Sequence, residues 1–222
     1  MTEPLVSVIM PVFNAEAFVA EALGSVLNQD YQPFEVLVVN DGSEDGSGAI
    51  VRSFDGVRYF EQENQGASSA RNFAARHANG EFVAFVDADD VVPPDKLTVQ
   101  VGYLLAHHEI AAVLGRQHWM QEPPGAVRDS VYGDLDGIPL LSMVVRREIL
   151  EEVGEFGEAP HEDMDFLIRL RAAGHRYTVL PEIVLHRRYH GANLYAGQGL
   201  NPLRIGSLKA KLDAERARQQ DR

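Results

Sequence analysis

The sequence predicts an α/β fold in which a mostly parallel central sheet is covered by helices on both faces. Short apolar segments alternate with amphipathic segments over residues 5–90. The apolar segments are continuous, without a polar residue at every second position, which is typical of strands buried on both faces. Polar clusters follow three of these strands, and parallel sheets bind ligands at the carboxyl ends of their strands. We therefore expect one site at one edge of the sheet.

The first strand and helix set the pattern of the first half. Residues 5–11 read as a buried strand, and Asn14 is expected to cap a helix over residues 14–28. Apolar side chains recur in i, i+4 rows along that helix, which gives it one face for the core. The elements that follow are a strand over 34–39, a short helix over 48–54, a strand over 57–62, a helix over 67–77 and a strand over 82–86.

The second half is less regular. We expect a helix over 94–107, a strand from residue 111, a strand-like segment over 141–145 and a helix over 162–173 that ends at Gly174. Residues 115–138 are rich in Gly, Pro and charge, and are expected to form a variable excursion. Residues 203–222 are helical by propensity and strongly charged.

The composition fits one large domain and excludes several kinds of site. The chain has 222 residues, 45% of them hydrophobic, which is enough to bury a core. It has no cysteine, so disulfides, thiolate metal ligands and a cysteine nucleophile are excluded. The remaining ligands are oxygen and imidazole, which suit Mg²⁺ or Mn²⁺ better than structural zinc.

The formal net charge of −13 bears on the choice of partners. Such a surface repels nucleic acid, so we expect no nucleic-acid partner. A phosphorylated ligand would need a metal bridge or a local basic patch. No apolar stretch reaches the ~18–20 residues of a membrane span, and the N-terminus lacks the pattern of a signal peptide. We expect a cytoplasmic protein that does not span a membrane, with peripheral contact to the inner membrane face left open.

The most informative segment is an apolar run, residues 83–86, that ends in Asp87, Ala88, Asp89 and Asp90. In an extended chain Asp87 and Asp89 point to the same side. Two neighbouring carboxylates repel each other and are costly to desolvate, and a hard divalent cation is the usual compensation. The alternative is a strand that ends in an ordinary acidic turn.

Two further polar segments follow strands. Residues 64–72 place a tight turn before a helix that carries Arg71, and a helix N-terminus with an Arg is suited to phosphate. The alternative is an ordinary helix with a solvated Arg. Asp41 ends the second strand, where its carboxylate could accept the N3–H of a uracil ring. Here the alternative is a plain Asp-Gly-Ser turn.

A group of acids opens the helix expected over 162–173. Asp163 is spaced to share the helix face with three apolar residues, Phe166, Leu167 and Leu170. Partial desolvation there would raise its pKa and make it a better base near neutral pH, with Glu162 as the substitute. We place Glu162, Asp165 and Arg169 on the outer side, where Asp165 and Arg169 form an i, i+4 pair. The alternative is that these acids only favour the positive end of the helix.

The dense basic patch lies at residues 187–193. His190 in this patch could complete an octahedral metal site, and the arginines could face a diphosphate; the alternative is a surface histidine. Trp119 is expected within the variable excursion, either stacked on a sugar or packed against the sheet.

Together these segments resemble the family 2 glycosyltransferases of the GT-A fold over roughly residues 5–195. The block at 6–16 resembles that family's opening strand and loop. The segments at 40–43, 64–72, 87–89 and 162–163 resemble its other signatures in the expected order. Each motif is short, but the ordered set is specific.

The resemblance implies an inverting transferase that moves one sugar from a nucleotide-diphosphate sugar, with a UDP-sugar as the first expectation, and that uses Mn²⁺ or Mg²⁺. It implies a single domain over 1–200, with a nucleotide-binding half at about 1–90 and an acceptor half at about 91–200. Helix propensity, and not the resemblance, predicts a helical tail at 201–222. The implied catalytic residues are Asp163 and Glu162, and the implied metal ligands are Asp89, Asp87 and His190. The implied nucleotide-sugar-binding residues are Pro11, Val12, Phe13, Asn14, Glu16, Asp41, Asn64, Gly66, Arg71, Asp87 and Ala88.

Several alternatives stay open. The acceptor is a glycan, a lipid-linked saccharide or a peptide, and the tail helix either pairs with a second subunit or is solvated. A nucleotidyltransferase of the GT-A fold is one rival, although it normally has a Gly- and Arg-rich loop after the first strand. A non-catalytic nucleotide-sugar-binding protein is the other. Donor turnover discriminates among the three, because fold alone does not settle function.

Overall fold

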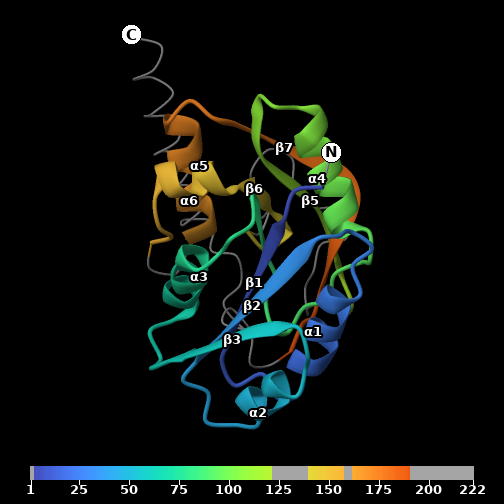
Figure 1. The fold of residues 1–222 in the computed structure, drawn as a ribbon, viewed down its shortest axis with the longest axis vertical. Coiled ribbons are helices and arrows are strands. Elements are labelled where there is room, and N and C mark those ends of the chain that lie inside the picture. The colour runs from blue at the N-terminus through green and yellow to red at the C-terminus, as the bar shows by residue number, and fades with distance from the viewer. Residues whose placement is uncertain (1–2, 122–139, 158–161, 191–222) are drawn as a thin grey trace.

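The computed structural model describes residues 3–121, 140–157 and 162–190, and within them the α/β prediction is confirmed. The strands form one seven-stranded sheet in the order β3-β2-β1-β4-β6-β5-β7 (Figure 1). Their bounds are β1 Val6–Val12, β2 Phe34–Asp41, β3 Val57–Gln62, β4 Phe82–Phe85, β5 Ile110–Trp119, β6 Val144–Arg146 and β7 Arg176–Arg187. Strand β6 runs antiparallel to both of its neighbours, and the other recorded pairings are parallel.

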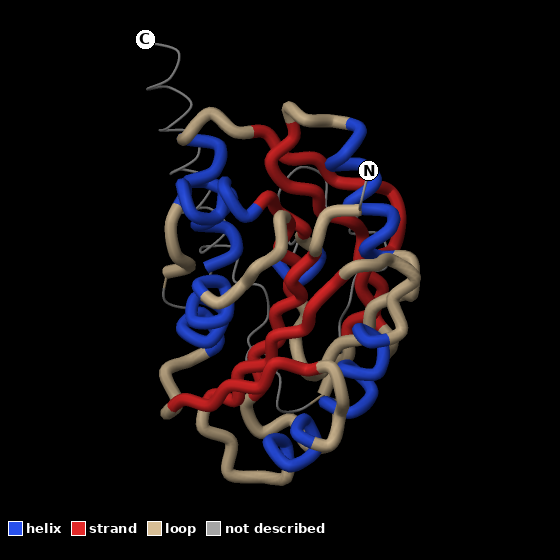
Figure 2. Tube along the Cα trace, in the orientation of Figure 1, coloured by secondary structure: helices blue, strands red, loops and turns tan. Residues whose placement is uncertain are grey.

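Helices cover both faces of the sheet, as Figure 2 shows. Their bounds are α1 Val19–Leu27, α2 Ser47–Arg52, α3 Ala67–Arg76, α4 Lys96–Ala106, α5 Arg147–Val153 and α6 Glu162–Ala172, with a 3-10 turn over Leu140–Ser142. Apolar side chains of α1, α2 and α4 share one hydrophobic cluster with the sheet, and those of α3, α5 and α6 share the other. The continuous apolar strands of the sequence are explained by this double cover.

Strand β1 lies in the middle of this arrangement. All of its residues are buried, and it pairs in parallel with β2 on one side and with β4 on the other. Val8 belongs to the cluster under α1 and α4, whereas its neighbour Ile9 belongs to the cluster under α3 and α6. The carboxyl ends of β1, β2 and β4 therefore meet at one edge of the sheet, where the sequence placed its polar segments.

The first helix begins later than predicted. The expected helix over 14–28 starts at Val19, and Asn14 does not cap it. Asn14 has a φ of 46°, a left-handed conformation that a helix cannot contain but that Asn tolerates. Its Oδ1 accepts the Glu44 N–H at 2.9 Å, and its N–H donates to Ser43 Oγ at 3.0 Å. Asn14 therefore ties the loop after β1 to the loop after β2.

The second half departs further from the prediction. Residues 115–119 were expected in a variable excursion but extend β5. Arg116 and His118 are exposed and alternate with less exposed neighbours, and in the sequence this polar segment resembles a loop. The segment expected as a strand over 141–145 is a 3-10 turn followed by β6. Helix α5 and strand β7 were not predicted. Residues 122–139 and the predicted tail helix lie outside the described residues.

The described helices give no candidate for a membrane span, since none has both the length and the apolar character that a crossing requires.

A lysine is buried at the start of α4. Lys96 is 1% exposed, and its Nζ lies 2.9 Å from Gln100 Oε1 and 3.4 Å from the Ser142 carbonyl oxygen. Burial disfavours the charged ammonium and lowers the pKa of Lys96 to about 7. The folded protein therefore releases a proton from Lys96 near neutral pH, whereas the unfolded chain keeps it to about pH 10.4.

We expect Lys96→Met to change how stability depends on pH. Between pH 7 and about 10 the unfolded state binds the extra proton, so Lys96 makes the wild-type free energy of unfolding rise with pH. That rise is several kcal/mol, since one pKa unit corresponds to about 1.4 kcal/mol. In the variant this part of the rise is absent, so its stability relative to wild type is greatest at or below pH 7. Urea denaturation from pH 6 to 10 measures the difference; parallel curves would contradict the assignment.

Candidate active site

The loops after β1 and β2 are joined by hydrogen bonds from both sides. The Ala15 N–H donates to Ser47 Oγ at 2.8 Å, and the Gly46 N–H donates to Glu16 Oε2 at 2.6 Å. Phe13, the first residue after β1, is 50% exposed. An exposed ring beside this hydrogen-bonded polar loop offers a flat apolar surface to a ligand at this edge. The predicted residues Pro11 and Val12 are buried at the end of β1 below it.

Asp41 is the buried polar residue at the end of β2, and its carboxylate organises the turn before α3. It accepts the Gln65 N–H at 2.9 Å, the Gly66 N–H at 2.8 Å and Gln62 Nε2 at 2.7 Å. A carboxylate has about four acceptor positions, so one is left beyond these three bonds. The turn is closely packed against Gly42, where a Cβ would lie 2.8 Å from the backbone nitrogen of Asn64.

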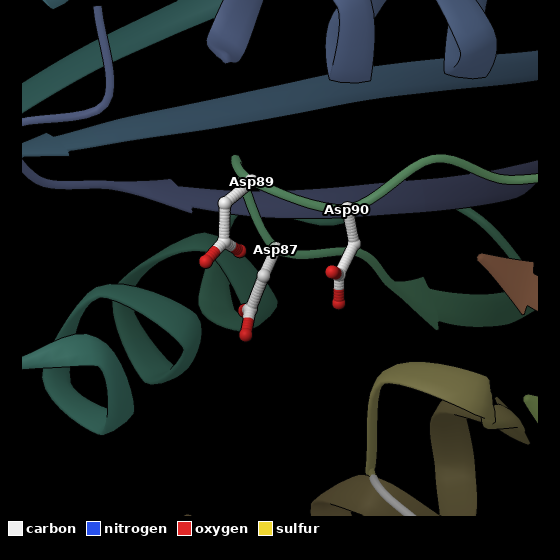
Figure 3. A group of neighbouring side chains, drawn as sticks. All are labelled: Asp87, Asp89 and Asp90. Atoms are coloured by element: carbon white, nitrogen blue, oxygen red, sulfur yellow. The ribbon is translucent and has the colours of Figure 1, made fainter. Parts of the chain in front are cut away.

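Three carboxylates gather on the loop after β4. Asp87, Asp89 and Asp90 each offer an oxygen within 4.8 Å of the others, and Figure 3 shows the three side chains projecting from the same side of the loop. An extended chain is not what brings them together, because β4 ends at Phe85 and the Asp90 N–H bonds back to the Asp87 carbonyl at 3.3 Å. The turn adds Asp90, which the sequence analysis did not assign to the site.

The close approach of these acids contributes to raised pKa values of Asp89 and Asp90. Burial and then the charges of Asp87 and Asp89 raise the pKa of Asp90 to about 7. Burial and then the charge of Asp87 also raise the pKa of Asp89, against the opposing effect of His190. A set of three oxygen ligands whose negative charges repel one another has the chemistry that a hard divalent cation requires. These residues therefore fit Mn²⁺ or Mg²⁺.

Side chains and a backbone N–H at and just after the end of β7 reach this loop. His190 Nε2 lies 3.0 Å from Asp89 Oδ2, and its ring stacks on Phe18 with centroids 4.4 Å apart. The Arg188 N–H donates to Asp90 Oδ1 at 2.9 Å, and Arg187 Nε lies 3.8 Å from Asp90 Oδ2. The structure thus brings His190 to the acidic loop, and its role as a metal ligand stays a prediction.

Arg71 lies on the other side of the same loop. Its side chain is 5% exposed, with Nη2 at 2.8 Å from Asp87 Oδ1 and Nη1 at 3.0 Å from Glu162 Oε1. The solvated Arg of the alternative interpretation is therefore wrong. Glu162 was predicted on the outer side of its helix, and this is also wrong, because its carboxylate faces Arg71 and its side chain is 15% exposed.

The other predictions for α6 have separate outcomes. Arg169 Nε donates to Asp165 Oδ2 at 2.8 Å, so the predicted outer pair is confirmed. The apolar face is confirmed as well, by the buried side chains of Phe166, Leu167 and Leu170. Asp163 lies in the first turn of α6, and its side chain lies outside the described part of the chain. Its role as the base stays a prediction.

Trp119 lies at the end of β5 and not in an excursion. Its ring is packed under the guanidinium of Arg187, with Arg187 Cζ 4.8 Å from the ring centroid. Asn64 and Gly66 lie exposed in the turn before α3, and Ala88 is buried within the acidic loop. Apart from Asp163, the predicted residues therefore line one edge of the sheet or lie directly beneath it.

Comparison with known proteins decides the family. The model of glycosyl transferase family 2 matches residues 7–165, which is more than half of the chain. The chain belongs to glycosyl transferase family 2. The match spans the loops after β1, β2 and β4, the turn before α3 and the first turn of α6.

Two bacterial relatives are named as glycosyltransferases. An uncharacterised glycosyltransferase of Rickettsia felis is 32% identical over 182 residues, which is 73% of this chain and 30% of that protein. An uncharacterised glycosyltransferase of Haemophilus influenzae is 39% identical over 113 residues, 49% of this chain and 45% of that protein. This family 2 chain therefore spans less than half the length of these relatives.

Solved structures share the fold. S. aureus TarS 1-349 in complex with UDP-GlcNAc aligns with a TM-score of 0.76 at 23% identity, over 95% of this chain and 66% of that one. The mannosyltransferase PcManGT of Pyrobaculum calidifontis, in complex with GDP-Man and Mn²⁺, aligns with a TM-score of 0.70 at 27% identity, over 88% of this chain and 60% of that one. The likeness to TarS, at 23% identity, concerns the fold alone. Together the two structures identify the fold of this family 2 chain as GT-A.

We expect Asp90→Asn to stabilise the metal-free protein and to weaken its response to metal. Two like charges about 4 Å apart repel by roughly 4 kcal/mol at an effective dielectric constant of 20, so removing one should give at least about 1 kcal/mol. The amide oxygen can still accept the Arg188 N–H. Urea denaturation at pH 8, with EDTA and with Mn²⁺, measures both effects.

Asp95→Asn is the matched control for this experiment, since Asp95 is an exposed acid five residues further along the chain. A loss of metal-free stability in Asp90→Asn, with Asp95→Asn unchanged, would show that Asp90 is adequately paired and that the cluster carries no excess repulsion.

Proposed function

We propose that this family 2 chain is an inverting, metal-dependent glycosyltransferase that moves one sugar from a nucleotide-diphosphate sugar to an acceptor hydroxyl. The observation that carries the proposal is the place of the three-carboxylate cluster. It lies beside Arg71, whose other carboxylate partner is the first residue of α6. The proposed cation site and the helix that holds the proposed base are therefore neighbours.

The donor would lie across the loops after β1, β2 and β4. Phe13 offers its exposed ring to the nucleotide base, and Asp41 has one acceptor position for a ring N–H. A UDP-sugar is the proposed donor. A GDP-sugar is the competing donor, because PcManGT is in complex with GDP-Man. The remaining proposed donor residues are Pro11, Val12, Asn14, Glu16, Asn64, Gly66, Asp87 and Ala88.

Asp89, Asp87 and His190 would hold the cation, which when bound supplies positive charge to a departing diphosphate. The Mn²⁺ in the PcManGT complex supports this choice of ion. Asp163 would accept the proton of the acceptor hydroxyl as that oxygen attacks the anomeric carbon from the face opposite the leaving group. The configuration at that carbon inverts as a consequence. A glycan, a lipid-linked saccharide or a peptide is the proposed acceptor class.

We expect Asp163→Asn to lower sugar transfer by about 10²–10⁴-fold, the usual contribution of a general base, while nucleotide binding persists. Release of nucleoside diphosphate from a panel of UDP- and GDP-sugars, with simple glycosides as acceptors, measures transfer, and calorimetry measures binding. Asp165→Asn, on the outer face of the same helix, is the matched control. Loss of nucleotide binding with intact folding would instead move Asp163 into the donor site.

We also expect Asp89→Ala to weaken nucleotide binding in the presence of Mn²⁺ by about 10-fold or more, with little change in EDTA. The reason is that Asp89 is the main proposed ligand of the ion between protein and diphosphate. Titration of UDP and GDP with and without Mn²⁺ makes the comparison. An unchanged dependence on Mn²⁺ would remove Asp89 from the metal site, and release of pyrophosphate from a nucleoside triphosphate would favour a nucleotidyltransferase.

A further inference from the structure

We propose that Arg71 is a positioning residue: it links Asp87 of the acidic loop to Glu162 and so fixes the first turn of α6, where Asp163 lies. This inference rests on the proposed function and assigns Arg71 and Glu162 a role in it that differs from direct contact with the donor. The sequence resemblance had implied that Arg71 helps to seat the nucleotide, and the acids at the start of the helix had made Glu162 the substitute for the base.

The contacts of Arg71 join three elements that are distant in the sequence. Its two terminal nitrogens bind carboxylates on opposite sides, Asp87 at 2.8 Å and Glu162 at 3.0 Å, which are 16 and 91 residues away along the chain. Helix α3 thereby holds the loop after β4 and the start of α6 through one planar group. A guanidinium is suited to this task because its N–H groups are fixed in one fork.

The side chain has little surface left for a ligand. It is 5% exposed, and its Nε is buried without a hydrogen-bond partner in the part of the chain that the structure describes. Burial disfavours the guanidinium charge, but Asp87 and then Glu162 more than offset this effect and raise the pKa of Arg71. To bind a phosphate, Arg71 would have to leave a carboxylate that compensates its buried charge.

The residue that follows Arg71 makes a second link to the same region. Asn72 Nδ2 donates to the Phe156 carbonyl at 2.9 Å, and the Phe156 N–H donates back to Asn72 Oδ1 at 2.9 Å. The Phe156 ring packs against Phe85 of β4 and Phe166 of α6, with centroids 5.2 and 4.9 Å away. The apolar packing thus places the body of α6 against the sheet, and Arg71 adds a polar contact at its first residue.

This polar contact matters for catalysis because Glu162 directly precedes Asp163. A base that is displaced by about 1 Å can lose 10²-fold in rate, even when the mutated residue does not touch the substrate. A positioning role predicts that loss of Glu162 lowers kcat and leaves nucleotide affinity unchanged. A role in donor binding predicts the reverse.

The decisive variant is Glu162→Ala, with Asp165→Ala as the matched control. Both truncate an acid on α6 and remove one ion pair with an Arg, but the pair of Asp165 with Arg169 faces outward. We expect Glu162→Ala to lower kcat by about 10- to 100-fold and to keep the Mn²⁺-dependent Kd for UDP within about twofold. The variant should also keep the acidic limb of the pH profile, which is the fall in rate at low pH as the base becomes protonated. Asp165→Ala should behave as wild type in all three.

Two further measurements separate the link from a general structural effect. Hydrogen exchange at the first-turn amides of α6 should quicken in Glu162→Ala and not in Asp165→Ala. In an Arg71→Met background, adding Glu162→Ala should cost little more, since both changes remove the same contact. If Arg71→Met does not fold, the single variant Glu162→Ala still decides the question.

The outcomes distinguish this inference from the proposed function. Active wild type with an unchanged kcat in Glu162→Ala would overturn the link and leave the transferase standing. A weakened UDP Kd in Glu162→Ala would overturn it in favour of a donor-binding role, and loss of the acidic limb of the pH profile would make Glu162 the base. A wild type that turns over none of the donor sugars overturns both.

Discussion

The excess negative charge after β4 determines which groups gather at this edge of the sheet. Asp87, Asp89 and Asp90 lie too close together to be ionised at no cost, as the raised pKa values of Asp89 and Asp90 indicate. The protein balances them from two sides, with Arg71 from α3 and with His190 and the Arg188 N–H beyond β7. These three carboxylates are the proposed cation site.

The same contacts hold distant parts of the chain in one site. Strand β4 is the middle strand of the sheet, so the loop after it follows a central strand. The chain after β7, an edge strand, reaches this loop, and α3 and α6 lie on one face of the sheet (Figure 1). A neutral loop would need neither Arg71 nor His190 beside it. Because Arg71 also pairs with Glu162, the acidic loop and the helix of the proposed base are connected through a single side chain. Under the proposed function, the contacts that balance the charge of the proposed metal site also position the proposed base.

Much of the fold could be predicted from the sequence because its signals are local. Continuous apolar runs identified β1, β2 and β4, and the expected strand over 57–62 coincides with β3. The predictions failed where a distant contact decides the local structure. Asn14 takes a left-handed conformation because it bonds Ser43 and Glu44 in another loop, and no pattern around residue 14 reports this.

The candidate site was predictable in its residue types and less so in its contacts. The motif at 87–89 marked the acidic loop, but the assumption of an extended chain left out Asp90, which a turn brings in. Helical spacing placed Glu162 outside, whereas a buried Arg 91 residues away draws its carboxylate inward. Periodicity describes one element at a time, and it cannot show which charge of another element will lie opposite.

A thermal-shift panel of UDP, GDP, TDP and CDP, each with and without Mn²⁺, tests the central claim most directly. We expect one of the four to stabilise the protein only when Mn²⁺ is present, and Asp89→Ala to lose this effect. A ligand at about 100 times its Kd adds roughly 2.7 kcal/mol of stability, which is readily measured. Stabilisation that is equal without metal, or no stabilisation by any of the four, would contradict a metal-dependent nucleotide-sugar site at the end of β4.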